Sequence, residues 1–126
     1  MSKRELFIYL FLIVGNAYSL DFEQLYKTWS NGVDSTYSAN KGLELWRYEM
    51  FPGKSCGSCH GDDLTKPGRH TKTNKLIKPL APSVNPKRLT KVKKINKWLK
   101  RNCKFTYKRV CTAEEKMSFI EFIRNQ

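Results

Sequence analysis

The chain has 126 residues, and its 24 lysines and arginines outnumber its 11 acidic residues, which gives a formal net charge of +13. This length suits one small domain, which has room for only a small core. A large apolar cofactor would therefore supply much of the interior. The charge is lopsided, because residues 61–126 hold 18 basic and five acidic side chains, whereas residues 1–60 hold six of each.

The N-terminal segment has the pattern of a secretory signal peptide. Two basic residues at positions 3–4 precede nine apolar residues at positions 6–14, and Ala17-Tyr18-Ser19 supplies small residues where a signal peptidase reads the chain. Nine residues fall short of the about 20 that span a bilayer, although an uncleaved anchor is the alternative. We expect cleavage that removes residues 1–19 and leaves residues 20–126 as one mature domain in the periplasm, without a stable membrane span.

Two helices are predicted before a cysteine-rich motif. The first covers residues 20–29, and a loop rich in Ser, Asn, Gly and Asp follows at 30–37. Ser38 is a candidate N-cap for a second helix that runs to about Tyr48.

The second helix carries a glycine on its apolar face, where Gly42, Leu45 and Trp46 are spaced i, i+3 and i+4. Glycine permits close approach, so we expect this helix to cross the last helix closely, with Trp46 and Phe119 packed nearby. An ordinary amphipathic bundle without this crossing is the alternative.

A long connection with four prolines covers residues 61–89, and the prolines argue against a helix or strand through most of it. A structureless loop of this length is unusual in a compact domain, so we expect it to wrap along the edge of a bound cofactor. Helices resume at residues 91–101, with Thr90 as N-cap, and after Thr112, which forms a capping box with Glu115. Inward-facing positions on these two helices are expected at Val92, Ile95, Trp98, Leu99, Met117, Phe119, Ile120 and Ile123. The predicted fold class is all-α, with three to four helices and no convincing strand.

The sequence Cys56-Gly57-Ser58-Cys59-His60 has the spacing that covalent haem attachment requires. The two thiols lie about one turn apart, so each can add to one vinyl group of the same porphyrin. His60 then lies under the iron and binds it through Nε2, while a carbonyl that we place within residues 78–82 accepts a hydrogen bond from Nδ1. The motif predicts a c-type cytochrome with one haem c, folded like the small all-helical monohaem cytochromes.

A redox-active dithiol and half of a zinc site are the alternatives for Cys56 and Cys59. A zinc site requires a second pair of ligands at comparable spacing, but Cys103 and Cys111 are separated by seven residues and the only other histidine is His70. A thioredoxin-like dithiol requires a βαβ context, which the sequence lacks. His60 directly after the second cysteine, together with the export signal, favours haem.

No methionine stands where electron-transfer cytochromes usually place the sixth ligand of the iron. Met1 leaves with the signal peptide, Met50 precedes the motif, and Met117 falls within the last helix, where a core role is more typical. The candidates that remain are His70, a lysine or a weak neutral oxygen donor.

Four separated segments occur in a characteristic order, namely residues 56–61, 79–83, 97–103 and 111–116. They resemble the Sphaeroides haem protein family, whose members are small, high-spin, oxygen-binding monohaem cytochromes c. The similarity covers roughly residues 40–126.

This resemblance implies that Asn102 is the sixth ligand of the ferric iron and that Cys103 and Cys111 form a disulfide beside it. It also implies that reduction releases the asparagine, after which oxygen or nitric oxide binds. An amide oxygen is a weak donor, and a bridge closing a short loop would restrict the backbone next to it. The alternatives are a helix C-terminal asparagine and two free thiols.

The predicted function is haem binding and electron transfer, with a weak Asn102 ligand that yields to oxygen or nitric oxide on reduction. One alternative is a plain electron carrier with His70 as a strong ligand. Another is a haem enzyme that turns over small oxygen or nitrogen compounds, although the sequence shows no distinct acid, base or substrate pocket, and whether the protein is an enzyme stays open.

The basic half of the chain predicts an acidic redox partner, for which the resemblance implies a dihaem cytochrome c. A plain solvated surface is the alternative. Nucleic acid is not expected as a partner, because an exported haem protein rarely meets it.

Overall fold

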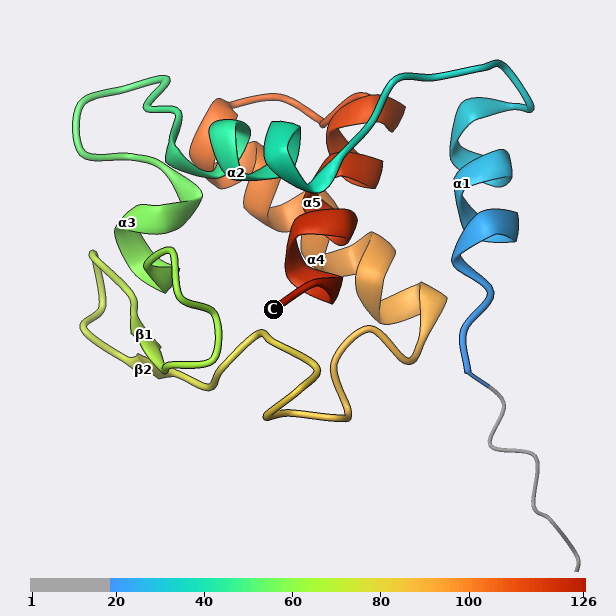
Figure 1. The fold of residues 1–126 in the computed structure, drawn as a ribbon. Coiled ribbons are helices and arrows are strands. Elements are labelled where there is room, and N and C mark those ends of the chain that lie inside the picture. The colour runs from blue at the N-terminus through green and yellow to red at the C-terminus, as the bar shows by residue number, and fades with distance from the viewer. Residues whose placement is uncertain (1–18) are drawn as a thin grey trace, which may run out of the picture.

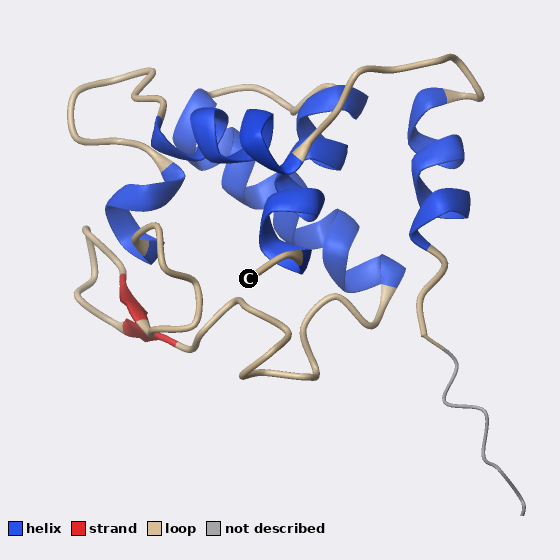
Figure 2. Cartoon of the chain, in the orientation of Figure 1, coloured by secondary structure: helices blue, strands red, loops and turns tan. Residues whose placement is uncertain are grey.

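A computed structural model describes residues 19–126 (Figure 1). Its helices are α1 (Phe22–Ser30), α2 (Ala39–Arg47), α3 (Cys56–His60), α4 (Val92–Tyr107) and α5 (Ala113–Arg124). The strands β1 (Gly68–Arg69) and β2 (Leu76–Ile77) pair as a short antiparallel hairpin (Figure 2). The predicted all-α class is confirmed, but the expectation of no strand is wrong for this hairpin, and α3 raises the number of helices within residues 19–126 to five. In the described part of the chain, no helix combines the length and apolar character needed to cross a membrane.

The predicted signal peptide, except its last residue, lies outside the described residues. The division between a signal segment and a mature domain at residue 20 therefore stays a prediction.

Side-chain caps fix where α1, α2 and α5 begin. Asp21 Oδ1 accepts from the backbone N–H of Gln24 at 3.0 Å and starts α1, so the predicted first helix begins two residues later than expected. Ser38 caps α2 as predicted, and Thr112 and Glu115 form the predicted capping box of α5. These signals are local in sequence, since each cap satisfies an N–H group three residues away.

Helix α4 ends six residues later than predicted, at Tyr107 rather than Arg101. Its last turns hold Cys103, Thr106 and Tyr107 in the interior, and that burial continues the helix past the expected end. It begins after Lys91, without a side-chain cap from Thr90.

The inward positions predicted on α4 and α5 are confirmed only in part. The residues that are buried or pack partly buried against the core are Ile95, Leu99, Met117, Phe119, Ile120 and Ile123. Val92 and Trp98 were predicted wrongly, because their side chains are 38% and 47% exposed. The buried stripe of α4 runs instead through Ile95, Leu99 and Cys103.

Helices α2 and α5 cross at Gly42, as predicted (Figure 1). A Cβ atom built on Gly42 would lie 2.8 Å from Phe122 Cβ and directly against the backbone carbonyl of Ser118. Trp46 packs beside the crossing, with ring centroids 6.1 Å from Phe119 and 5.4 Å from Phe122. The close approach therefore depends on the missing side chain.

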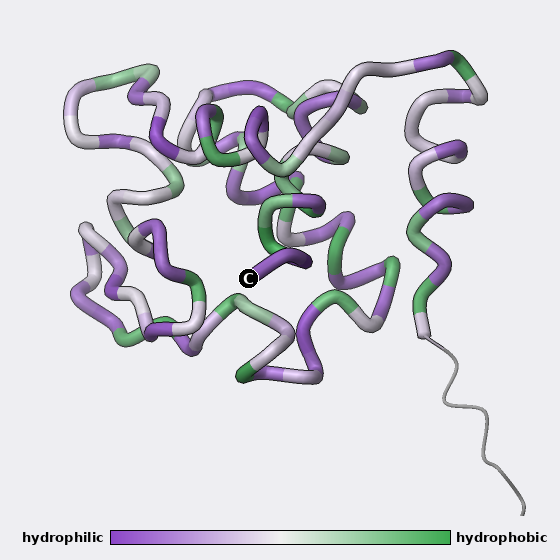
Figure 3. Tube along the Cα trace, in the orientation of Figure 1, coloured by the Kyte–Doolittle hydropathy of each residue, from purple (hydrophilic) through white to green (hydrophobic). Residues whose placement is uncertain are grey.

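A second cluster of buried residues joins α1 to α4 and α5, and apolar segments alternate with hydrophilic ones along these helices (Figure 3). Its buried members are Leu25, Tyr26, Ile95, Met117 and Ile120. Tyr26 also donates to Glu121 Oε1 at 2.7 Å, which ties α1 to α5. Met117, 1% exposed, has the core role predicted for it.

The long connection is anchored to the protein by Leu64, which is 1% exposed. Its carbonyl accepts from the backbone N–H groups of Leu80 and Ala81 at 3.1 and 3.0 Å. The connection therefore folds back on itself around Leu64 and the equally buried Ala81, so protein contacts support it in addition to the cofactor edge expected for it.

Candidate haem site

The motif Cys56–His60 forms the single turn of α3, and its flanking serines set that turn. Ser55 Oγ accepts from the backbone N–H of Ser58 at 3.1 Å, and Ser58 Oγ accepts from the backbone N–H of Ser55 at 2.9 Å. The turn ends at Gly61, whose φ of +67° suits glycine. Cys56 and Cys59 are both free thiols and both partly exposed. One helical turn thus presents two thiols and an imidazole together, as thioether attachment of one haem requires.

The environments of the two thiols differ. Burial raises the pKa of Cys56 to about 11, and Cys56 Sγ lies 3.8 Å from Tyr107 Oη. Cys59 Sγ instead faces the connection, where it accepts from the backbone N–H of Thr71 at 3.4 Å. Cys56 therefore sits against the end of α4, and Cys59 sits against the hairpin.

His60 has the form that an iron ligand requires. Burial, with smaller electrostatic contributions from Arg88 and His70, lowers its pKa to about 4, so the imidazole is neutral near pH 7. A neutral imidazole has a free nitrogen lone pair for a metal. Trp46 packs 5.4 Å from the imidazole between ring centroids, and its Nε1–H donates to the Gly61 carbonyl at 2.8 Å, which links α2 to this turn.

Gly68 allows the hairpin to pack directly onto α3. A Cβ atom built there would lie 2.9 Å from the Cα atom of His60 and against the carbonyl of Cys59. No other residue type fits this contact without movement of the backbone. The packing of β1 against the backbone of Cys59 and His60 therefore helps to fix the position of α3.

The carbonyl expected to orient His60 within residues 78–82 stays a prediction, but other donors already use part of this stretch. The Pro79 carbonyl accepts from Asn85 Nδ2 at 3.0 Å and from Arg88 Nε at 3.1 Å. Arg88 also donates to the Lys78 carbonyl at 3.1 Å, and the backbone N–H groups of Val84 and Asn85 donate to the Ala81 carbonyl. The carbonyls of Leu80 and Pro82 are the remaining acceptors in the stretch.

The structure places Asn102 on α4, exposed and one residue before buried Cys103. Cys103 and Cys111 form the disulfide that the resemblance implied, with Cα atoms 5.7 Å apart. Asn102 lies inside the helix, so a role as a helix-terminal residue does not account for it.

Two exposed aromatic residues share the face of α4 that carries Asn102. Trp98 precedes it by four residues and Phe105 follows it by three, and these spacings place side chains on one helix face. Their exposed fractions are 47% and 37%. An apolar planar group would find two aromatic contacts beside an amide on this face.

His70, the rival sixth ligand, uses Nδ1 as an acceptor. The backbone N–H groups of Lys72 and Thr73 both donate to this atom, each at 3.2 Å. A histidine that binds iron through Nε2 carries its proton on Nδ1, and that proton would face two donors here. The hydrogen bonds of the hairpin therefore disfavour His70 as an iron ligand.

The two methionines that the sequence disfavours as ligands lie away from these residues, and the zinc alternative lacks support. Met50 is 38% exposed before the motif, and Met117 is in the core. The described residues contain no group of three His, Cys, Asp or Glu side chains that could hold a metal ion, which leaves the zinc alternative without ligands.

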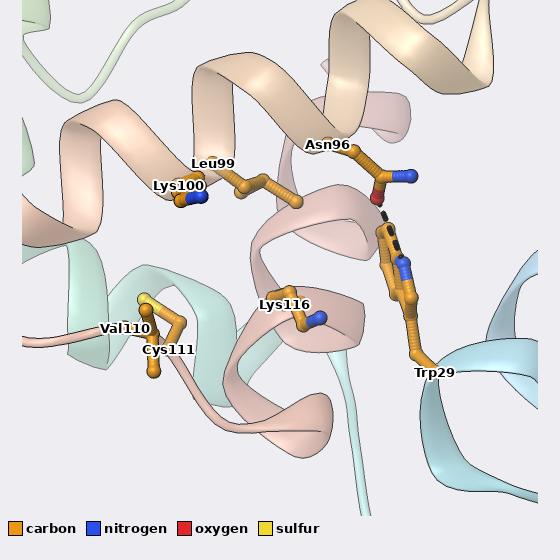
Figure 4. A pocket seen from close by; sticks show the side chains of 7 residues that line it. All are labelled: Trp29, Asn96, Leu99, Lys100, Val110, Cys111 and Lys116. Carbon is orange, nitrogen blue, oxygen red and sulfur yellow. Dashed lines mark hydrogen bonds between the residues drawn. The ribbon is translucent and has the colours of Figure 1, made fainter.

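A pocket of about 350 Å³ lies between α1, α4 and α5, outside the motif (Figure 4). Its lining residues are Trp29, Asn96, Leu99, Lys100, Val110, Cys111 and Lys116. Trp29 Nε1 donates to Asn96 Oδ1 at 2.9 Å across it, and Lys116 Nζ lies 4.9 Å from the Trp29 ring centroid. These contacts hold α1 against the rest of the chain, and none involves α3.

A helical fold with a thiol pair, a neutral imidazole and a disulfide-tethered helix defines a small monohaem c-type cytochrome. A family model described as a domain of unknown function (DUF1924) matches residues 33–123. The cytochrome c-type protein SHP of Cereibacter sphaeroides is 36% identical over 107 residues, which cover 82% of each chain. The chain belongs to this Sphaeroides haem protein family, and its cofactor is one covalently attached haem c.

Solved structures agree with this assignment. The structure of oxidized SHP, described as an oxygen-binding cytochrome c, matches with a TM-score of 0.73 at 34% identity, covering 86% of this chain and 100% of that one. Oxidized cytochrome c'' from Methylophilus methylotrophus matches with a TM-score of 0.66 at 29% identity, covering 80% and 90% of the two chains. In sequence, this second relative is 35% identical over 69 residues, which cover 55% of this chain and 48% of that protein.

Proposed function

We propose that this protein is an exported, redox-active cytochrome c that accepts a small diatomic ligand when it is reduced. The observation that carries the proposal is the place of Asn102, which stands exposed on α4 beside the Cys103–Cys111 bridge. The two methionines of the described chain lie elsewhere. The tethered Asn102 amide, a weak oxygen donor, is therefore proposed as the iron ligand in place of a methionine sulfur.

The haem supplies the redox centre and the site at which a diatomic ligand binds. Cys56 and Cys59 would tether it through thioethers, and His60 would supply the permanent nitrogen ligand of the iron. Asn102 would supply its amide oxygen as the second iron ligand in the ferric state, because a weak oxygen donor suits ferric better than ferrous iron. On reduction Asn102 would release the iron, which would then be open to oxygen or nitric oxide.

The disulfide limits how far Asn102 moves. It joins α4 to the start of α5 across eight residues, next to the residue that must leave and return. A restrained backbone keeps a poor ligand near its position without a strong bond. In support, the solution structure of cytochrome c'' is described in terms of haem-ligand detachment, and it matches this chain with a TM-score of 0.66 at 27% identity.

Electrons arrive from an acidic redox protein that docks on the basic half of the chain. Helix α4 contributes exposed cations that form no ion pair among the described residues, namely Lys93, Lys94, Lys97, Lys100, Arg101 and Lys104. Complementary charge raises association rates with an acidic surface. A dihaem cytochrome c is the partner class that the family resemblance implies.

Optical spectra of the purified holoprotein test this function. We expect a high-spin ferric spectrum, and a reduced spectrum that changes when carbon monoxide is added. Asn102→Ala should alter the ferric spectrum while the protein stays folded. An unchanged ferric spectrum in that variant would show that another group is the ligand, and a reduced protein inert to carbon monoxide would refute ligand binding altogether.

Export has a separate test. The mature protein purified from periplasmic extract should begin at Leu20 and carry the added mass of one haem, as intact-mass spectrometry measures. A full-length chain in the cytoplasmic fraction would contradict the export proposal and leave the haem assignment untouched.

A further inference from the structure

His70 occupies a turn that holds its ring in one orientation. Its backbone N–H donates to the Lys75 carbonyl at 2.9 Å, and its carbonyl accepts from the Asn74 N–H at 2.8 Å. Its Nδ1 accepts from the backbone N–H groups of Lys72 and Thr73, each at 3.2 Å. Backbone and side chain of this one residue therefore organise the whole β1–β2 turn.

These bonds also decide which ring nitrogen carries the proton. A neutral imidazole has one N–H donor and one acceptor nitrogen. Two N–H groups point at Nδ1, so Nδ1 is the acceptor and Nε2 carries the hydrogen. The hairpin therefore presents a fixed N–H donor at the far end of the ring.

The ring lies where the hairpin meets both elements of the haem site. Next to His70 in the chain, Thr71 donates its backbone N–H to Cys59 Sγ at 3.4 Å. The His70 ring itself lies 5.5 Å from the Phe105 ring, between centroids. Phe105 is three residues from Asn102 on the same face of α4. His70 thus connects the thiol turn with the helix face that carries the proposed sixth ligand.

We propose that the Nε2–H of His70 donates a hydrogen bond to the diatomic ligand that replaces Asn102. This inference rests on the proposed function and adds the group that stabilises the incoming ligand. Bound oxygen carries partial negative charge, which a fixed N–H donor stabilises with little reorganisation. The same donor would distinguish polar ligands from apolar ones.

Two substitutions separate the two nitrogens. His70→Asn places Oδ1 where Nδ1 stands, so the turn keeps its acceptor for Lys72 and Thr73 but loses the distal donor. His70→Gln places an amide N–H near Nε2 and removes the acceptor from the turn. The two variants therefore test the Nε2–H donor and the hydrogen bonds of the β1–β2 turn independently.

The readouts are the C–O stretching frequency of the reduced carbon monoxide complex and the oxygen dissociation rate, measured on the holoprotein. We expect His70→Asn to raise the C–O frequency and to speed oxygen dissociation about five- to tenfold, the range for loss of one hydrogen bond. His70→Gln should stay close to wild type in both. The ferric spectra of both variants should match wild type, because His70 is not the iron ligand.

Equal frequencies and rates in wild type and His70→Asn would overturn the inference while leaving the proposed function intact. A ferric spectrum that changes in both variants would overturn it as well, because His70 would then be a ligand. Wild-type protein that binds neither gas would instead refute the proposed function itself. Thermal unfolding of each variant separates loss of the donor from loss of the turn.

Discussion

The phenolic hydroxyl of Tyr107 donates a 2.6 Å hydrogen bond to the backbone carbonyl of Leu45. It joins the last turn of α4 to the last turn of α2, and the same oxygen lies 3.8 Å from Cys56 Sγ. The Tyr107 ring also stacks on Phe119, with centroids 6.3 Å apart and planes 12° from parallel. One residue in the unpredicted part of α4 therefore connects both helices of the crossing to the thiol turn.

Tyr107→Phe should lower the free energy of unfolding by about 1 kcal/mol, because one buried hydrogen bond is lost while the ring stacking remains. Chemical denaturation of the holoprotein measures this. Tyr48→Phe is the matched control, since Tyr48 is 56% exposed and should change stability little. Equal effects of the two substitutions would show that the bond to Leu45 is not stabilising.

Gly42→Ala should destabilise the protein by about 1–3 kcal/mol, despite the higher helix propensity of alanine. The added methyl would meet the Ser118 carbonyl and Phe122, so α2 and α5 would have to move apart. Gly57→Ala is the control, because a Cβ there makes only ordinary contacts, 3.4 Å from Asp62 Oδ1 and 3.5 Å from Trp46 Cδ1. If thermal unfolding showed a larger loss of stability for Gly57→Ala than for Gly42→Ala, the close crossing of α2 and α5 at Gly42 would be contradicted.

Replacing both Cys103 and Cys111 by serine should cost about 2–3 kcal/mol of stability, the amount expected for a short closed loop. It should also weaken the ferric Asn102 ligand, because α4 is no longer tied beside it. The fraction of ferric protein that binds an added competing ligand, such as imidazole, should then rise. An unchanged imidazole affinity in a less stable variant would assign the bridge a purely structural role.

Acid should destabilise the protein partly through Glu115. The hydrogen bonds from Arg109, at 2.8 and 2.9 Å, are the main cause that holds the pKa of Glu115 below its usual value, although burial opposes them. A carboxyl group with a lowered pKa stabilises the fold above the unfolded pKa of about 4.3 and loses that contribution as pH falls. The free energy of unfolding, measured from pH 7 to pH 3, should therefore fall more steeply in wild type than in Glu115→Gln. Parallel curves would show that the Arg109–Glu115 ion pair does not stabilise the fold.

Electron transfer from an acidic c-type cytochrome should slow as ionic strength rises, because salt screens the attraction. Lys97→Gln with Lys100→Gln should slow the bimolecular rate and flatten its salt dependence. The control is Lys27→Gln with Lys41→Gln, which removes the same charge from lysines paired with Glu23 and Glu114. If both double variants slowed the reaction equally, net charge alone would explain the rate, and α4 would not be the docking face.

Local signals in the sequence determined much of the fold and of the site. The thiols and imidazole of residues 56–60 fit in one helical turn because their spacing matches it. Ser38 and Thr112 capped their helices because each acts on an N–H three residues away. Gly42 marked the crossing, since only a residue without a side chain permits that approach.

Long-range packing decided the rest. Helix α4 continues to Tyr107 because contacts with α2 and α5 bury its end, and nothing near Arg101 in sequence records them. Trp98 has the spacing of a core residue yet lies exposed, because the buried face of α4 is set by what packs against it. The tautomer of His70 depends on a hairpin that two-residue strands form, too short for any periodic pattern to reveal. Local sequence thus specifies the thiol turn, because its residues are neighbours in the chain, whereas tertiary packing decides which side chains of α4 and the connection lie near that turn.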